Sequence, residues 1–195
     1  MKNNPTITKK IIAGKFKGKT IKLPSKETTR SSKAIVLESF FNTLQFDIID
    51  AVLVEVFSGS GSIGLEALSR GAKRIIFMEK DRDAIRTLRE NIAQTDPSKC
   101  EVFEGDSFST INQVKKRLHS LDESAFIYVD PPFAFREGME EIYDKTIDMI
   151  ASFPLEMATL IVIEHMSTLE LPDSIGHFNQ IKSKRFGKTS LTYYA

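Results

Sequence analysis

Short apolar runs alternate along this sequence with stretches in which apolar residues recur every three or four positions. The short runs predict buried β-strands, and the recurring positions predict helices with one apolar face. The expected strands are a segment that begins at residue 53 and the segments 74–78, 101–103 and 125–129, and the expected helices between them are 65–70, 82–94 and 108–118. Strands and helices in this order are typical of an α/β fold with a mostly parallel sheet.

The two ends of the chain have patterns of their own. Apolar and basic residues alternate over 7–23, around Gly14 and Gly18, and predict a short β-hairpin with one lysine-covered face. Apolar residues at helical spacing from Ser32 to Leu44 predict a helix that packs this hairpin onto the rest of the chain. Towards the other end we expect an acidic amphipathic helix over 137–150, a helix end and buried strand over 155–164, and a closing hairpin over 177–194.

Length and composition indicate one hydrophobic core. A chain of 195 residues with 41% hydrophobic content can bury one good-sized core, so we expect an amino-terminal arm, residues 1–44, on a single domain, residues 45–195. The single cysteine, Cys100, excludes an intrachain disulfide, and no apolar run approaches membrane-spanning length. The three histidines lack metal-ligand spacing. We therefore expect a soluble, cytoplasmic and monomeric protein with no metal.

The net charge of +1 conceals a strong asymmetry. Residues 1–33 contain ten Lys or Arg and a single acid, Glu27, whereas the rest of the chain is acidic. Lysines on an edge hairpin can serve only to prevent aggregation, but this excess favours contacts with nucleic-acid phosphates. A second basic cluster in the closing hairpin either extends that surface or solvates a turn. The candidate RNA-binding residues are Lys15, Lys17, Lys19, Lys22, Arg30, Lys184 and Arg185.

A glycine-rich turn follows the first expected strand of the domain. Gly59, Gly61 and Gly64 fit the pattern G-x-G-x-x-G, which lets the backbone approach a nucleotide-like ligand at a helix N-terminus. Glu79 ends the next strand, twenty residues after Gly59, where an acid can bind both ribose hydroxyls. Asp106 follows the third strand. NAD also uses the glycines and the first acid, but S-adenosylmethionine accounts for the acid at the third strand as well, so we favour S-adenosylmethionine.

The segment Asp130-Pro131-Pro132-Phe133 follows the fourth expected strand. Its prolines fix φ near −65° and remove two N–H donors, so the loop presents the Asp130 carboxylate and backbone carbonyls as acceptors. A nucleobase with an exocyclic amine suits such a loop, because Asp130 and the Pro131 carbonyl can accept its two hydrogens while Phe133 stacks on the ring. The alternative interpretation is a proline-rich turn with a structural role alone.

Taken together, several segments resemble a known family. EVFSGSGSIGLEALSRGA, FMEKD, EGDS and DPPF are similar to motifs of the class I methyltransferases that modify bases, and most closely to the RsmD-like 16S rRNA (guanine-N2) methyltransferases. The opening IIAGKFKGKTIKLP and the closing KSKRFGKTSLTYY resemble that family's terminal hairpins. Ahead of Phe41-Asn42, however, the segment Ser31–Leu37 lacks a proline, an aspartate and an arginine of the family's pattern.

The resemblance implies a fold, a reaction and a set of site residues. The fold is Rossmann-like, with helices on both faces of a seven-stranded, mostly parallel sheet of order 3-2-1-4-5-7-6, in which the seventh strand is antiparallel. The reaction is methylation of a guanine N2 in 16S rRNA, naked or within the small ribosomal subunit. The implied catalytic residues are Asp130, Pro131, Pro132 and Phe133, and the implied residues for S-adenosylmethionine are Glu55, Phe57, Gly59, Gly61, Gly64, Glu79, Lys80, Asp106 and Ser107.

Two other functions are compatible with the same residues. DPPF also occurs in adenine-N6 methyltransferases, so a DNA adenine-N6 methyltransferase is one alternative. A non-catalytic RNA-binding protein with a vestigial cofactor fold is the other.

Overall fold

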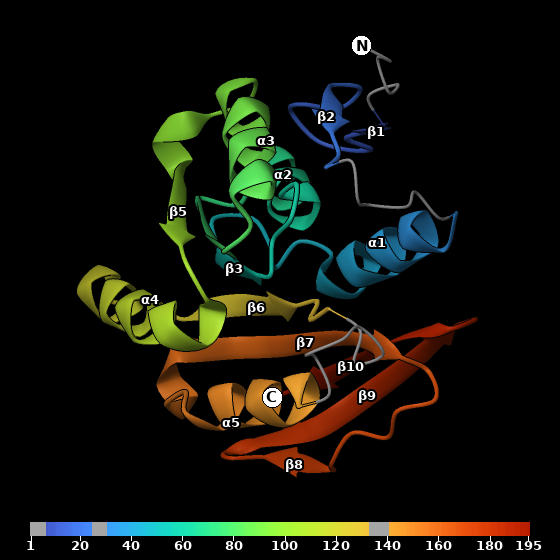
Figure 1. Ribbon diagram of the computed structural model, residues 1–195, viewed down its shortest axis with the longest axis vertical. Coiled ribbons are helices and arrows are strands. Elements are labelled where there is room, and N and C mark those ends of the chain that lie inside the picture. Colours follow the sequence, from blue (N-terminus) through green and yellow to red (C-terminus); the bar gives the residue numbers. More distant parts are fainter. Residues whose placement is uncertain (1–6, 25–30, 133–140) are drawn as a thin grey trace.

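The computed structural model describes residues 7–24, 31–132 and 141–195. Within these ranges eight strands form a central sheet (Figure 1). They are β3 Val52–Val56, β4 Arg74–Glu79, β5 Cys100–Glu104, β6 Ala125–Val129, β7 Ala158–Met166, β8 Ser174–Ile175, β9 Phe178–Phe186 and β10 Thr189–Tyr194. Their order across the sheet is β5-β4-β3-β6-β7-β10-β9-β8.

The pairing confirms the expected topology. Strands β3 to β7 pair in parallel, and β10 is antiparallel to both of its neighbours, β7 and β9. The expected count of seven strands was one short, because the two residues Ser174–Ile175 add an antiparallel edge strand to β9. Gly176, at φ 59°, makes the tight turn between β8 and β9 that sequence patterning did not reveal.

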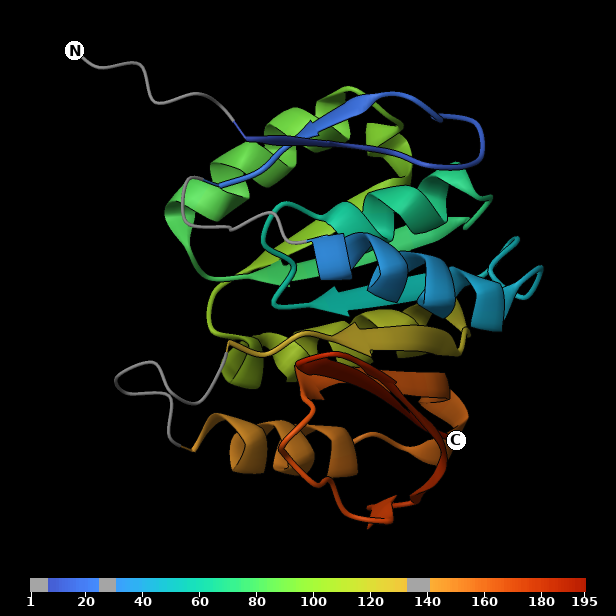
Figure 2. The same cartoon turned by 90° about the vertical axis from the view of Figure 1, so that its right-hand side faces the viewer.

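Helices cover both faces of the sheet (Figures 1 and 2). One face carries α1 Ser31–Leu44, α2 Ser62–Ser69 and α3 Arg82–Ala93, and the other carries α4 Ser107–Leu121 and α5 Ile142–Ala151. Two 3₁₀ turns, Pro97–Lys99 and Leu155–Met157, lead into β5 and β7. The helix expected over 137–150 is described only from Ile142, and residues 137–140 lie outside the described residues.

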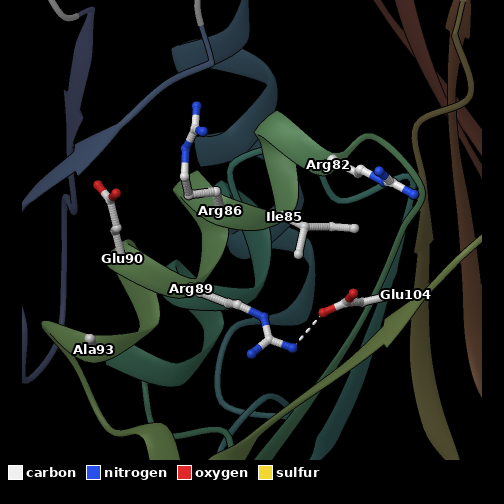
Figure 3. Close-up of a pocket in the computed structure, with 7 residues that line it drawn as sticks. All are labelled: Arg82, Ile85, Arg86, Arg89, Glu90, Ala93 and Glu104. Carbon is white, nitrogen blue, oxygen red and sulfur yellow. Dashed lines mark hydrogen bonds and ion pairs between the residues drawn. The ribbon is translucent and has the colours of Figure 1, made fainter.

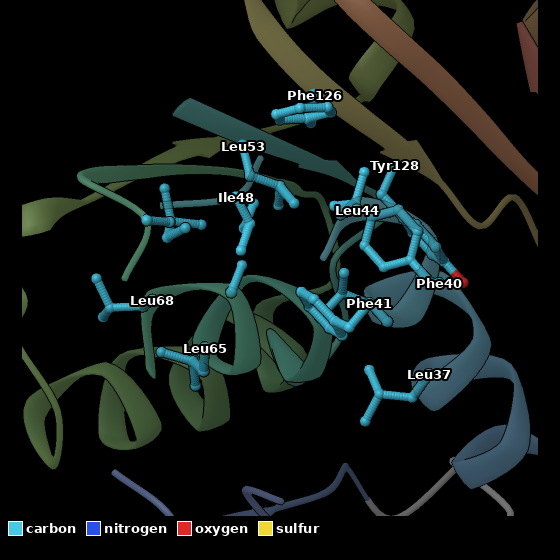
Figure 4. Packing of buried hydrophobic residues seen from close by; sticks show 14 of the residues in the cluster. Leu37, Phe40, Phe41, Leu44, Ile48, Leu53, Leu65, Leu68, Phe126 and Tyr128 are labelled. Carbon is cyan, nitrogen blue, oxygen red and sulfur yellow. The ribbon is translucent and has the colours of Figure 1, made fainter. Parts of the chain in front are cut away.

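Alternation along the strands divides the core into two layers. Leu53 faces the layer under α1 and α2, whereas Val54 faces the layer over α4 and α5. Figure 4 shows the first layer, in which Phe40 and Phe41 of α1 pack near Leu53 and Tyr128. The rings of Phe40 and Tyr128 meet edge to face, with centroids 4.8 Å apart. This helix was expected to pack the hairpin onto the rest of the chain; it packs on the sheet, whereas the bonds that hold the hairpin come from α2 and α3.

The amino-terminal hairpin, β1 Thr8–Lys10 and β2 Thr20–Lys22, lies against α2 and α3 (Figure 2). Buried polar side chains of those helices hold its backbone. Glu66, 1% exposed, accepts hydrogen bonds from the Ile12 N–H at 2.8 Å and the Ala13 N–H at 3.1 Å. Ser69 Oγ accepts from the Phe16 N–H at 2.8 Å and donates to the Ala13 carbonyl at 2.5 Å. The hairpin is therefore docked on the domain by specific bonds.

Close approach makes glycine necessary in this hairpin. Gly14 has φ +80°, and a Cβ at this position would lie 1.8 Å from the Ser69 carbonyl oxygen. No side chain fits there without displacing the arm from α2.

We expect Glu66→Ala to lower the free energy of unfolding by about 3 to 5 kcal/mol, because Arg70 and two part-buried backbone donors would lose their buried acceptor. Urea denaturation measures the loss. Glu123→Ala is the matched control, since its pair with Lys73 is partly exposed and contributes at most about 1 kcal/mol. Equal losses in the two variants would contradict the docking role of Glu66.

Candidate active site

The carboxyl ends of four neighbouring strands bring the candidate residues to one edge of the sheet. Val56, at the end of β3, pairs with Met78 of β4 and with Val129 of β6. Glu79 pairs with Glu104 at the end of β5. Because parallel strands end at the same edge, the glycine-rich turn and the acids that follow β4, β5 and β6 gather there. The structure thus brings together the residues assigned from sequence to cofactor and catalysis, as far as it describes them.

The glycine-rich turn combines positive backbone angles with tight packing. Phe57 and Gly61 have φ 60° and 77°. A Cβ on Gly61 would lie 2.4 Å from Leu88 Cδ1, and one on Gly64 would lie 2.5 Å from both Ile75 and Phe77. These two glycines therefore let α2 lie close to β4 and α3, a structural requirement that stands beside any contact with a ligand.

Glu79 holds the start of this turn. It is 9% exposed, and its Oε2 accepts a hydrogen bond from the Gly59 N–H at 2.7 Å. Its Oε1 accepts from the N–H groups of Lys80 at 2.8 Å and Asp81 at 2.9 Å. One carboxylate thus fixes the glycine turn of β3 against the end of β4.

Glu55 holds the other end of the turn. It is 4% exposed and is the last residue but one of β3. Its two oxygens accept from the N–H groups of Ile63 at 3.2 Å and Gly64 at 2.7 Å. These N–H groups belong to the first turn of α2, where backbone donors lack intrahelical partners and the helix dipole favours a negative charge. The anion at this helix N-terminus is a side chain of the protein itself.

The end of β5 adds a more exposed acid. Asp106 caps α4 by accepting from the Phe108 N–H at 3.0 Å, and its Oδ2 lies 3.6 Å from Lys80 Nζ. Ser107, the first residue of α4, is buried. The rings of Phe57 and Phe108 meet edge to face with centroids 5.6 Å apart, so two aromatic side chains join the ends of β3 and β5.

Asp130 and Pro131 follow β6 directly. The Asp130 N–H bonds the Val56 carbonyl at 3.4 Å, which keeps the loop next to the glycine-rich turn. Asp130 and Pro132 are partly exposed, and Pro131 is buried. Phe133, expected to stack on a base, lies outside the described residues.

Two buried residues beside Asp130 were not singled out from the sequence. The Tyr128 hydroxyl donates to Glu164 of β7 at 2.6 Å, and both side chains are buried. Burial, followed by the nearby charges of Glu164 and Asp130, raises the pKa of Tyr128 well above its usual range. The sequence did contain a signal for this pair, because a tyrosine and a glutamate stand inside otherwise apolar strands. Apolar patterning alone assigns such positions to the core.

The candidate RNA-binding residues divide into two groups. Lys15, Lys17, Lys19 and Lys22 are all exposed on the arm, although Lys19 donates to the Gln94 carbonyl and Lys22 pairs with Glu90 at 2.8 Å. Lys184 instead donates to hydroxyls of α1, and burial together with Lys182 lowers its pKa. Arg185 donates to the Gly187 carbonyl within its own turn. Arg30 lies outside the described residues.

Comparison with known proteins assigns the family. Residues 9–195 match the family described as Conserved hypothetical protein 95. The chain belongs to this family.

Related proteins and a solved structure agree with the family assignment. "Putative rRNA methyltransferase YlbH" of Bacillus subtilis is 30% identical over 95% of this chain and 97% of its own length. "Ribosomal RNA small subunit methyltransferase D" of Escherichia coli K12 is 30% identical over 95% of this chain and 88% of its own. The structure "Putative methyltransferase yhhF from Escherichia coli" superposes with a TM-score of 0.75 at 27% identity, covering 96% of this chain and 97% of the other. The resemblance and the class I methyltransferase fold are confirmed.

Two further observations bear on the site of this family member. In the described parts of the chain, no three His, Cys, Asp or Glu side chains are placed to hold a metal ion. No helix in those parts has the length and apolar character needed to cross a membrane.

We expect Glu79→Gln to destabilise the protein by about 1 to 3 kcal/mol, because an amide offers one acceptor oxygen to three backbone donors and sets its NH2 against at least one of them. Denaturation with urea measures the loss, and amide exchange at Gly59 should become faster. Glu104→Gln, at the end of the next strand, is the control, since its exposed pair with Arg89 contributes about 1 kcal/mol or less. If Glu79→Gln leaves the stability unchanged, Glu79 does not hold the glycine-rich turn in place.

Proposed function

We propose that this protein is an S-adenosylmethionine-dependent methyltransferase that modifies the exocyclic N2 amine of a guanine in 16S rRNA. The observation that supports this most is that two features meet at one edge of the sheet. One is the glycine-rich turn held by Glu79, and the other is the segment that begins at Asp130, whose two prolines have no N–H and offer only carbonyl acceptors. The rRNA named for the Bacillus and Escherichia relatives supports the substrate class. We further propose that residues 1–44 are an RNA-contacting arm, and that the protein works as a cytoplasmic monomer on 16S rRNA or a small-subunit particle.

The first turn of α2 favours S-adenosylmethionine over NAD. In dinucleotide-binding folds the pyrophosphate binds the N–H groups of this helix N-terminus. Here the carboxylate of Glu55 already accepts from two of them, the N–H groups of Ile63 and Gly64. A pyrophosphate at this position would meet a buried negative charge, whereas the sulfonium and ammonium groups of S-adenosylmethionine would meet a favourable one.

The residues present fit this cofactor. Glu79 would hold the ribose while it keeps its backbone bonds, since each carboxylate oxygen can accept more than one hydrogen bond. Asp106, 42% exposed at its side chain, would accept from the adenine amine, with Lys80 and Ser107 beside it. Phe57 and Phe108, whose rings already meet edge to face, would together border the base on one side. The cofactor would supply an activated methyl group on a sulfonium.

The acceptor loop would orient the guanine amine. Asp130 and the Pro131 carbonyl accept the two hydrogens on N2, which directs the nitrogen lone pair towards the methyl carbon. The cofactor, when bound, would supply the methyl group to N2 and leave as the neutral thioether, and Asp130 would take the proton that the amine gives up and pass it to water. Asp130 need not be a strong base, because orientation in a near-attack geometry lowers the barrier by several kcal/mol. Phe133 would stack on a base turned out of the RNA.

Transfer of a radiolabelled methyl group tests the function directly. We expect label on 16S rRNA, as naked RNA or as small-subunit particles, and its appearance as N2-methylguanine after nuclease digestion. Label on adenine N6 in DNA would establish the DNA methyltransferase alternative instead. RNA binding without transfer to any substrate would establish the non-catalytic alternative.

We expect Asp130→Asn to reduce turnover by about 100-fold or more with nearly unchanged affinity for the cofactor, because the amide presents a donor to the substrate amine. Single-turnover methylation gives the first quantity, and calorimetry with S-adenosylhomocysteine gives the second. If both fall together, the loop is a structural part of the cofactor site.

The arm lysines differ in how far the fold already uses them. No ion pair is found for Lys15 or Lys17 among the described residues, so we expect Lys15→Ser with Lys17→Ser to lower the slope of log affinity against log salt by about 1.4, or 0.7 for each single-strand phosphate contact. Filter binding at several salt concentrations measures the slope. Lysines that only protect an edge would leave the slope unchanged and the variant prone to aggregation, which light scattering detects.

A further inference from the structure

A hollow of about 600 Å³ lies along the outer side of α3 (Figure 3). Arg82, Arg86 and Arg89 line it together with Ile85, and Glu104 at the end of β5 forms its far wall. In Figure 3, Arg82 and Arg89 lie on either side of Ile85, and Arg89 is turned towards Glu104. None of these arginines was among the RNA-binding candidates taken from the sequence.

The arginines remain available to an external anion. Arg86 and Asp83 form a pair whose side chains are 71% and 74% exposed, and Arg89 pairs with Glu104 where both are also well exposed. Exposed pairs of this kind contribute little, so a phosphate can compete for the guanidinium. No ion pair is found for Arg82 in the part of the chain that the structure describes. A guanidinium also binds phosphate through two parallel N–H bonds, which a lysine ammonium cannot do.

Helix α3, along which the hollow lies, runs between the arm and the candidate active site. At one end of α3, Lys22 pairs with Glu90, and Lys19 donates to the Gln94 carbonyl just beyond the helix. At the other end, Arg82 follows the segment 79–81, where Glu79 and Lys80 stand at the sheet edge. The arginines are spaced four and three residues apart, which places them along one side of the helix. The three arginines therefore lie along α3 between the arm contacts at Glu90 and Gln94 and the sheet edge at Lys80, over about 16 Å of helix axis, and the acids Glu90 and Glu104 line the same hollow.

We propose that this α3 groove binds phosphates of the RNA strand between the arm and the acceptor site. The inference rests on the proposed function and extends it, because two of the four arm lysines already bond to α3 or to the residue that follows it, which leaves the arm fewer cations for RNA. Arg82 and Arg86 contact the phosphates, and Ile85 offers an apolar floor to a ribose or base. The groove positions the RNA and takes no part in methyl transfer.

The test compares two double variants of the full-length protein that remove the same charge. Arg82→Ser with Arg86→Ser removes one arginine that has no ion pair among the described residues and one in an exposed pair. Lys116→Ser with Lys73→Ser is the control. Lys116 lies exposed on α4, on the opposite face of the sheet, and Lys73 precedes β4 at the opposite edge, paired with Glu123.

We expect the arginine variant to lower the salt slope of 16S rRNA binding by about 1.4, at 0.7 per contact, and to raise KM for RNA several-fold. Its kcat and its affinity for S-adenosylhomocysteine should equal those of the wild type. The slope of the control should fall much less than that of the arginine variant. Arg82→Lys with Arg86→Lys should keep the slope and bind RNA more weakly than the wild type, since charge remains and the two-bond geometry is lost.

The outcomes separate the inference from the function beneath it. A wild-type slope in the arginine variant, or an equal fall in the control, overturns the groove while RNA methylation by the wild type still supports the function. Absence of both binding and methylation of rRNA by the wild type overturns the proposed function itself.

Discussion

Two buried carboxylates hold the backbone of the glycine-rich turn, and the geometry of the candidate site depends on them. Glu79 fixes the start of the turn to the end of β4, and Glu55 fixes its end to the first turn of α2. Phe57, in a left-handed conformation, costs conformational energy that these charge-assisted bonds help to offset. The two carboxylates also make this edge acidic, which suits a cationic ligand and disfavours a pyrophosphate.

The arm shares structural elements with this turn. Asn91 of α3, 2% exposed, accepts from the Lys22 N–H at 2.9 Å and donates to the Lys22 carbonyl at 2.9 Å. The same amide donates to the Ser60 carbonyl of the glycine-rich turn at 3.0 Å. One side chain therefore fixes the spacing between the hairpin and the turn.

Apolar periodicity predicted the strands, and the strand-end motifs predicted the edge at which the site lies, because both are local signals, whereas the strand order came from the resemblance to the family. The motifs also placed Glu79, Asp106 and Asp130 at the same edge, since parallel strands end together. The hydrogen bonds between Glu66 and the arm could not be predicted from sequence patterning, because they join residues more than fifty positions apart. The bond between Tyr128 and Glu164 was missed for the same reason, and it depends on a register that appears only when β6 and β7 pair. The clamping role of Glu55 also lay hidden, since its position in an apolar strand gave no sign of which N–H groups it would meet.

The position of β10 affects how the sheet can be completed during synthesis. β10 follows β9 in the chain but lies between β9 and β7 in the sheet. Because only β10 links β9 to β7, β9 cannot be attached to the parallel part of the sheet until β10 has left the ribosome. A nascent chain interrupted at Gly187 would lose the connection of three strands to the sheet, although only one of them would be missing from its sequence. Quality control of unfinished chains would thus meet an open sheet edge at β7, whose residues Ile161–Glu164 are buried in the complete protein.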